Sequence, residues 1–109
     1  MKIRQLAEAS RDLEDALDYY TDASPILCSA LLFEVDQALR RIAEFPHAWR
    51  PVGGGLRSHA VGRFPYTVIY RLEPGQILVV AYAHYRRSPR FWRTRLQDGD
   101  GIEKYRDVA

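Results

Sequence analysis

Ile77-Leu-Val-Val-Ala-Tyr-Ala-His84-Tyr-Arg-Arg-Ser-Pro89-Arg-Phe-Trp92-Arg-Thr-Arg95 is the stretch that decides the fold. From Gln76 to Tyr82 or His84 it is nearly continuously apolar, which predicts a strand that is buried on both faces. Ser88-Pro89 then predicts a short helix with Ser88 as its candidate N-cap. The rest of the chain must therefore supply neighbouring strands and a covering layer.

Two further strands precede this segment. Residues 64–72 are rich in aromatic and β-branched side chains, which is typical of a central strand, and residues 56–61 form a shorter strand. Glu73-Pro-Gly75-Gln predicts the hairpin turn into the last strand. Residues 46–55 contain Pro46, Pro51 and three glycines and are predicted to be a loop.

The first half predicts a strand over residues 1–6 and then two helices joined by a short turn. Ser24 is the candidate N-cap of the second helix, Pro25 its first residue, and Pro46 stops it after about Phe45. The apolar positions expected to face the core are Ala9, Leu13, Ala16, Leu17 and Tyr20 in the first helix and Leu31, Val35, Ala38, Ile42 and Phe45 in the second. The opposite face of the first helix carries Asp12, Glu14, Asp15 and Asp18, and its part around Glu14, Asp15 and Asp18 is interpreted as solvated.

Together these elements predict an α+β domain. Its N-terminal strand is followed by an antiparallel two-helix hairpin, packed on an antiparallel-rich four-stranded sheet, and by a short C-terminal helix. Residues 1–96 are expected to form the single domain. Residues 97–109 contain Asp-Gly-Asp-Gly and little to bury, and are predicted to be a mobile tail.

Composition indicates where in the cell the protein acts and whether it binds a cofactor or metal. No run approaches the ~18 apolar residues of a membrane span, and the N-terminus does not have the pattern of a signal peptide. A single cysteine, Cys28, fits a reducing compartment, so a cytoplasmic location and no membrane contact are expected. No cofactor is expected, and the spacing of His47, His59 and His84 predicts no metal site.

Charge is distributed unevenly along the chain. Residues 1–40 carry eight acids and four bases, whereas residues 41–97 carry two acids and ten bases. Five of those bases form an acid-free cluster with interleaved aromatic residues: Arg86, Arg87, Arg90, Arg93 and Arg95 with Tyr85, Phe91 and Trp92. The cluster suits an anionic partner, either a nucleic acid or an acidic protein segment. The alternative is a basic helix that is merely solvated.

The partner-binding candidates are Arg57, Arg63, Tyr85, Arg86, Arg87, Arg90, Trp92 and Arg93. Two of these assignments have an alternative. Trp92 either seals the end of the core or forms a binding hot spot. Arg57 and Arg63 are either structural partners of the acidic helices or ligands of the partner.

Several pieces of the chain, in order, resemble the RelE/ParE toxin superfamily over residues 1 to about 95. They are Ala9-x-x-Asp12-Leu13 with Tyr19-Tyr20, Arg41-Ile-Ala-Glu-Phe-Pro46, Gly55-Leu56-Arg57, Gly62-Arg63-Phe64-Pro65-Tyr66-x-x-x-Tyr70, and Ala83-His84-x-Arg86-Arg87-x-Pro89-x-x-Trp92. The pattern is most similar to the ParE and plasmid-stabilisation branch.

The resemblance implies the toxin of a bacterial type II toxin–antitoxin pair. It implies a cognate antitoxin that docks a partly disordered segment, by helix-in-groove burial and charge pairing. For the ParE branch it implies DNA gyrase as target and no enzymatic activity. The expected assembly is a homodimer or a toxin–antitoxin hetero-oligomer.

Two other functions stay open. One is a metal-independent, ribosome-dependent endoribonuclease of the RelE type, with His84 as acid or base and Arg63, Arg86 or Arg87 on the phosphate. Three departures from the RelE pattern count against it: Thr67 stands where an arginine is usual, Ser58-His59-Ala60 where lysines are common, and Phe91 or Trp92 where a tyrosine or histidine is usual. The other is an inactive toxin fold that only binds antitoxin. For His84 the structural alternative is a strand-end residue hydrogen-bonded to a backbone or tyrosine partner.

Overall fold

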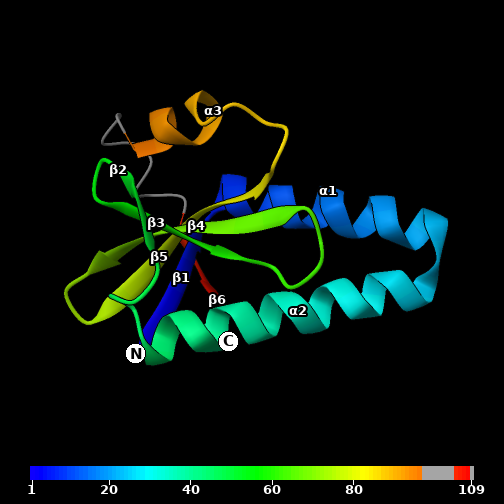
Figure 1. Ribbon diagram of the computed structural model, residues 1–109, viewed down its shortest axis with the longest axis horizontal. Coiled ribbons are helices and arrows are strands. Elements are labelled where there is room, and N and C mark those ends of the chain that lie inside the picture. The colour runs from blue at the N-terminus through cyan, green and yellow to red at the C-terminus, as the bar shows by residue number, and fades with distance from the viewer. Residues whose placement is uncertain (97–104, 109) are drawn as a thin grey trace.

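The computed structural model describes residues 1–96 and 105–108 of the chain (Figure 1). The helices are α1 (Ala7–Ala23), α2 (Pro25–Glu44) and α3 (Arg90–Arg93), and the 3-10 turn η1 (Thr94–Leu96) follows α3. The strands are β1 (Lys2–Leu6), β2 (Arg50–Gly53), β3 (Leu56–Ala60), β4 (Tyr66–Glu73), β5 (Gln76–His84) and β6 (Tyr105–Val108). The predicted α+β class and the order of its helices are confirmed.

All of these strands belong to one sheet, in the order β2-β3-β4-β5-β1-β6. β1 runs parallel to β5, and the other neighbours are antiparallel. β5 is the apolar strand predicted to be buried on both faces: its residues from Ile77 to Ala83 are all buried. The long pairing of β4 with β5 therefore sets a rigid centre for the fold.

The helical hairpin covers one face of this sheet, and its far end projects beyond the strands (Figure 1). Ser24 accepts a hydrogen bond from the backbone N–H of Ile26 at 3.2 Å, and Pro25 begins α2, as predicted. The predicted stripe of α2 is buried from Leu31 to Ile42. Phe45 was expected inside and is 55% exposed, because the chain has left helical geometry at that residue.

The sheet has six strands in the described part of the chain, not four. β2 lies inside the segment predicted to be a loop, so that prediction was wrong for residues 50–53. A proline is compatible with an edge strand, where an N–H is not needed for the ladder, and β2 is such an edge with an irregular register at Pro51/Gly53. β6 lies within residues 97–109, and the remainder of that predicted tail falls outside the described residues.

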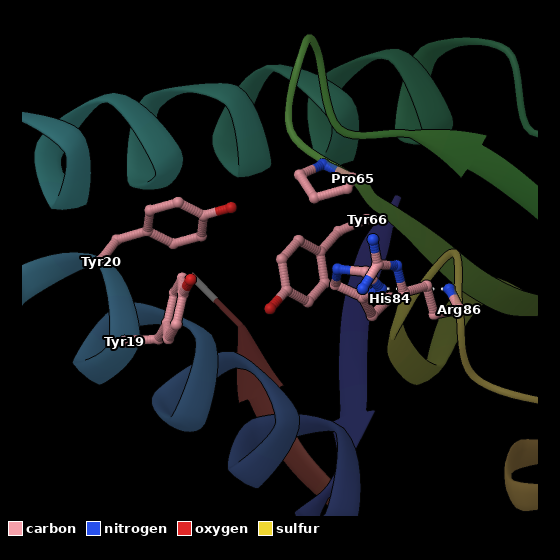
Figure 2. A pocket seen from close by; sticks show the side chains of 6 residues that line it. All are labelled: Tyr19, Tyr20, Pro65, Tyr66, His84 and Arg86. Atoms are coloured by element: carbon pink, nitrogen blue, oxygen red, sulfur yellow. Dashed lines mark hydrogen bonds between the residues drawn. The ribbon is translucent and has the colours of Figure 1, made fainter. Parts of the chain in front are cut away.

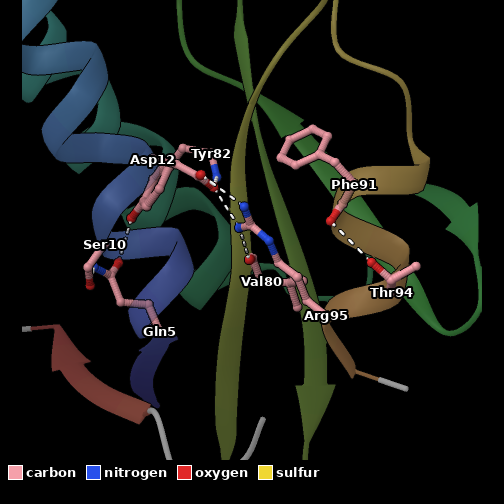
Figure 3. Close-up of polar contacts among 8 residues, drawn as sticks. All are labelled: Gln5, Ser10, Asp12, Val80, Tyr82, Phe91, Thr94 and Arg95. Atoms are coloured by element: carbon pink, nitrogen blue, oxygen red, sulfur yellow. Dashed lines mark hydrogen bonds and ion pairs between the residues drawn. The ribbon is translucent and has the colours of Figure 1, made fainter. Parts of the chain in front are cut away.

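A buried polar chain joins α1 to the sheet. The Tyr82 hydroxyl donates to Gln5 Oε1 at 2.9 Å, and Gln5 Nε2 donates to Ser10 Oγ at 2.6 Å (Figure 3). Burial first, and the nearby Asp12 carboxylate second, raise the pKa of Tyr82. The phenol therefore stays a neutral donor, which is the form that this chain of hydrogen bonds needs.

Candidate functional site

The arginines after β5 divide into two groups by where their guanidinium groups lie. Arg95 forms an ion pair with Asp12, with both side chains 12% exposed, and it also donates to the Val80 carbonyl at 2.9 Å (Figure 3). Arg93 donates to the Val52 carbonyl of β2 at 2.8 Å. These two arginines hold α3 and η1 against the rest of the molecule.

The other group faces solvent. Arg86 and Arg90 are exposed, and Tyr85 is 59% exposed. The Arg87 guanidinium lies 3.7 Å from the centre of the Phe91 ring, an arrangement that stiffens a long side chain. We refer to Tyr85, Arg86, Arg87 and Arg90 as the outward arginine patch. The sequence predicts one continuous cluster, and the structure separates these solvent-facing residues from Arg93 and Arg95, whose guanidinium groups bind backbone carbonyls.

Three other partner-binding candidates have distinct environments. Arg57 is partly buried and donates to the Trp49 carbonyl at 2.8 Å, a structural contact with the backbone and not the predicted pairing with the acidic helices. Trp92 is 5% exposed and belongs to the core, which is the first of its two interpretations. Arg63 lies exposed in the link between β3 and β4, on the same end of the sheet as His84. Of these three candidates, only Arg63 is exposed to a partner in solution, whereas Trp92 is buried.

His84 ends β5 and is partly buried. Its Nδ1 accepts a hydrogen bond from the backbone N–H of Arg86 at 3.0 Å, and its ring meets Tyr66 edge-on with centroids 5.1 Å apart. An accepting Nδ1 places the proton of the neutral ring on Nε2. The structural interpretation of His84 therefore holds for one nitrogen, while Nε2 keeps a hydrogen-bonding capacity.

An open hollow of about 290 Å³ lies between the sheet and α3. Thr67, Ile69 and Ala83 form part of its floor, and Trp92 and Pro89 line the opposite side. The titratable side chains among its described lining residues are His84, Tyr85 and Arg87. This combination offers a cation, one imidazole and one phenol, and no carboxylate is among the described lining residues, so any acid–base cleavage of RNA here would depend on His84 and Tyr85.

A larger hollow of about 510 Å³ lies where the helical hairpin meets the sheet, and sequence reasoning did not single it out. Figure 2 shows Tyr19 and Tyr20 of α1 on one side, opposite Pro65, Tyr66, His84 and Arg86. Burial, followed by Tyr20, Tyr19 and Asp15, raises the pKa of Tyr66. The signal in the sequence was the pair Tyr19-Tyr20 together with Phe64-Pro65-Tyr66, which lie 45 or so positions apart.

Of the remaining histidines, His47 is exposed and His59 has contacts within the fold. His59 Nδ1 lies 2.6 Å from the Ala60 carbonyl oxygen, and its ring packs edge-on against Trp49. Within residues 1–96 and 105–108, no cluster of histidine, cysteine and carboxylate side chains is suited to a metal ion. In the same part of the chain, no helix has the length and apolar character needed to cross a membrane.

Comparisons with known proteins agree on one family. Residues 3–89 match the profile described as the ParE toxin of the type II toxin–antitoxin system parDE. Toxin ParE2 of Mycobacterium tuberculosis, in two strains, is 35% identical over 80 residues, which are 72% of this chain and 75% of that protein. A solved structure of the chromosomal ParDE system from P. aeruginosa matches with a TM-score of 0.59 at 18% identity. That match covers 77% of this chain and 95% of the other, and at this identity it supports the fold.

Proposed function

Because this chain belongs to the ParE family of type II toxins, we propose that it binds DNA gyrase and is neutralised by a cognate antitoxin docked on its outward arginine patch. The observation that carries the antitoxin part is the rigid placement of that patch. Arg86, Arg87 and Arg90 follow directly from the buried strand β5, and Arg93 and Arg95 fasten the segment behind them. A preorganised cationic surface loses little entropy when an acidic segment binds.

An apolar surface on the hairpin extends what an antitoxin could bury. Ile26 is 80% exposed, Phe33 is 61% exposed and Leu32 is 48% exposed, all on α2. An amphipathic antitoxin helix would cover such side chains, and its acidic flank would reach arginines. Both features together favour a partner that wraps around the toxin over one that touches a single site.

The gyrase part rests on membership of the ParE branch and on the chemistry of the hollow between the sheet and α3. That hollow presents one histidine, with its Nδ1 engaged, and no carboxylate among its described lining residues. A target inside the cell would place the toxin in the cytoplasm. This function needs a binding surface and no catalytic group.

A ribosome-dependent endoribonuclease is the second candidate, and His84 is the observation that favours it. Its Nε2 carries the proton of the neutral ring, and Tyr85 and Arg87 line the same hollow. An imidazole beside a guanidinium can protonate a leaving oxygen and hold a phosphate.

Controlled expression tests the proposal as a whole. Induction of the chain alone should arrest growth and raise a DNA-damage response, and co-expression of the antitoxin encoded beside it should restore growth. Growth arrest with fragmented messenger RNA and no DNA-damage response would favour the nuclease. No arrest at all from a folded chain would reduce the function to antitoxin binding.

A further inference from the structure

The hollow at the junction of hairpin and sheet shares Arg86 with the outward arginine patch, but its tyrosines have no part in the proposed function. It continues into a second hollow of about 200 Å³, because Tyr19, Tyr66 and His84 line both. Asp15 and Arg87 are among the residues that line only the second. The combined space is within the range of small-molecule sites.

The rings of this hollow are ordered to different degrees. Tyr20 is held edge-on against Phe64, and Tyr66 edge-on against His84, each pair with centroids 5.1 Å apart. Tyr19 meets Tyr20 in the same way but is 69% exposed, so its ring can move over an occupant. Fixed and movable aromatic rings on opposite sides suit a flat aromatic ligand that stacks between them.

Charged side chains lie at both ends of the space. Arg86 is exposed at the rim of the larger hollow, while Asp15 lines the smaller one together with Arg87, whose guanidinium lies over the Phe91 ring. Asp12, the other carboxylate there, is neutralised by Arg95. Asp15 is close enough to contribute to the raised pKa of Tyr66, which places its charge near the ring that the two hollows share. The complementary ligand is anionic at one end and carries hydrogen-bond donors at the other.

We propose that this hollow binds a guanine nucleotide, with the base between Tyr19 and Tyr66, its Watson–Crick edge on Asp15, and its phosphate on Arg86. Guanine is the base that presents two adjacent donors, N1–H and the 2-amino group, and a carboxylate accepts such a pair in a bidentate manner. The tyrosine hydroxyls that point into the space in Figure 2 are left to contact the sugar. The source of the nucleotide is either a free mononucleotide or a guanosine within a single strand.

Calorimetric titration with guanosine 5′-monophosphate at low salt tests this. Inosine 5′-monophosphate lacks only the 2-amino group and should bind about tenfold more weakly, and adenosine 5′-monophosphate should be weaker still. Guanosine without phosphate should also lose about tenfold or more. The proposal would be overturned if millimolar guanosine 5′-monophosphate gave no heat of binding, or if the three monophosphates bound with equal affinity.

Variants locate the site. Tyr19→Ala should weaken binding of the guanine nucleotide by about tenfold, and Asp15→Asn should remove its advantage over the adenine nucleotide. Asp18→Asn is the matched control: it neutralises an exposed carboxylate on the same helix outside the hollow and should leave the affinity unchanged. All three positions are exposed, so unfolding midpoints should stay near that of the parent. Binding that is insensitive to both Tyr19→Ala and Asp15→Asn would contradict the assignment.

Two further titrations distinguish a free nucleotide from single-stranded nucleic acid, and either of these from a docked protein segment. A short thymidine strand with one central guanosine should bind more tightly than the mononucleotide if the ligand is single-stranded nucleic acid, and more weakly if it is a free nucleotide. An acidic peptide that binds in a Tyr19-dependent manner, where the guanine nucleotide does not bind, would show a protein-docking pocket and would overturn the proposal.

Discussion

Asp12 and Arg95 lie 83 positions apart in the chain and meet in a bidentate ion pair, with Nη1–Oδ2 at 2.7 Å and Nη2–Oδ1 at 3.0 Å. Asp12 Oδ2 also accepts the backbone N–H of Tyr82 at 3.1 Å. One carboxylate of α1 therefore joins the central strand β5 to the turn η1 that follows the arginine patch. The position of that patch depends on a residue at the other end of the sequence.

Replacing Asp12 should destabilise the fold well beyond a surface change. Asp12→Asn leaves the Arg95 charge largely buried without its partner, and the expected loss of unfolding free energy is about 3 kcal/mol. Urea unfolding measures it. The control is Asp36→Asn, whose carboxylate pairs with Arg40 on the surface of α2, and it should lose less than about 1 kcal/mol. Similar losses in both variants would contradict a supporting role for the Asp12–Arg95 pair.

Gly62 is a second residue that positions the elements, because it lies in the link between β3 and β4 where that link passes close to α2. Its φ is +51°, and a Cβ there would collide with the Glu34 carboxylate. Gly62→Ala should cost about 1–2 kcal/mol, chiefly from the left-handed backbone, because the Glu34 carboxylate ends a flexible side chain that can shift aside. Adding Glu34→Ala should restore part of that loss, since it removes the collision and leaves the backbone strain. Strictly additive effects in a double-mutant cycle, measured by urea unfolding, would show that the two residues do not meet.

Charge reversal of the outward arginine patch should weaken antitoxin binding. Arg86→Glu with Arg90→Glu is expected to raise the Kd by about tenfold or more and to reduce its dependence on salt, because the lost attraction is electrostatic. Arg40→Glu with Arg41→Glu makes the same change of charge on α2, away from α3 (Figure 1), and should have a smaller effect. Equal effects of the two pairs would indicate non-specific attraction to the positive charge of the protein.

His84 distinguishes the two candidate activities. In a gyrase-directed toxin, His84→Ala should lower toxicity only as far as it loosens the fold, by about 1 kcal/mol for the lost hydrogen bond and ring contact. In a nuclease that uses His84, the same change should reduce cleavage by about 10²–10⁴-fold while antitoxin binding survives. His59→Ala is the matched control, because it removes a histidine of β3 that also has a backbone contact and an edge-on aromatic neighbour.

The sequence predicted the parts of the fold that local pattern determines. The apolar run of β5 can be buried only in the middle of a sheet, and the apolar stripe from Leu31 to Ile42 only by packing one helix face on that sheet. The fold class and the order of the elements along the chain could therefore be predicted. Strand β2 was not predicted, because its proline and glycine residues indicate a turn and its strand geometry depends on pairing with β3. Its position at the sheet edge is determined by that tertiary contact and not by the local sequence.

The candidate site was predictable in composition and unpredictable in orientation. The arginine cluster is evident in the sequence, but nothing local distinguishes Arg86 and Arg90, which face solvent, from Arg93 and Arg95, which bind backbone carbonyls. The sequence places Asp12 on the acidic face of the first helix but does not reveal its partner, because Arg95 is remote in the chain. The tyrosine hollow likewise forms from two segments that only the folded chain brings together.

The central claim is that this ParE-type toxin acts on DNA gyrase by binding and not by cleaving RNA. Its most direct test combines the purified chain with gyrase and relaxed plasmid, and in parallel with ribosomes translating a defined messenger RNA. We predict gyrase-dependent linear plasmid after protein denaturation, suppressed by the antitoxin, together with intact messenger RNA. Cleaved messenger RNA that is lost in His84→Ala, with no linear plasmid at any toxin concentration, would contradict the claim.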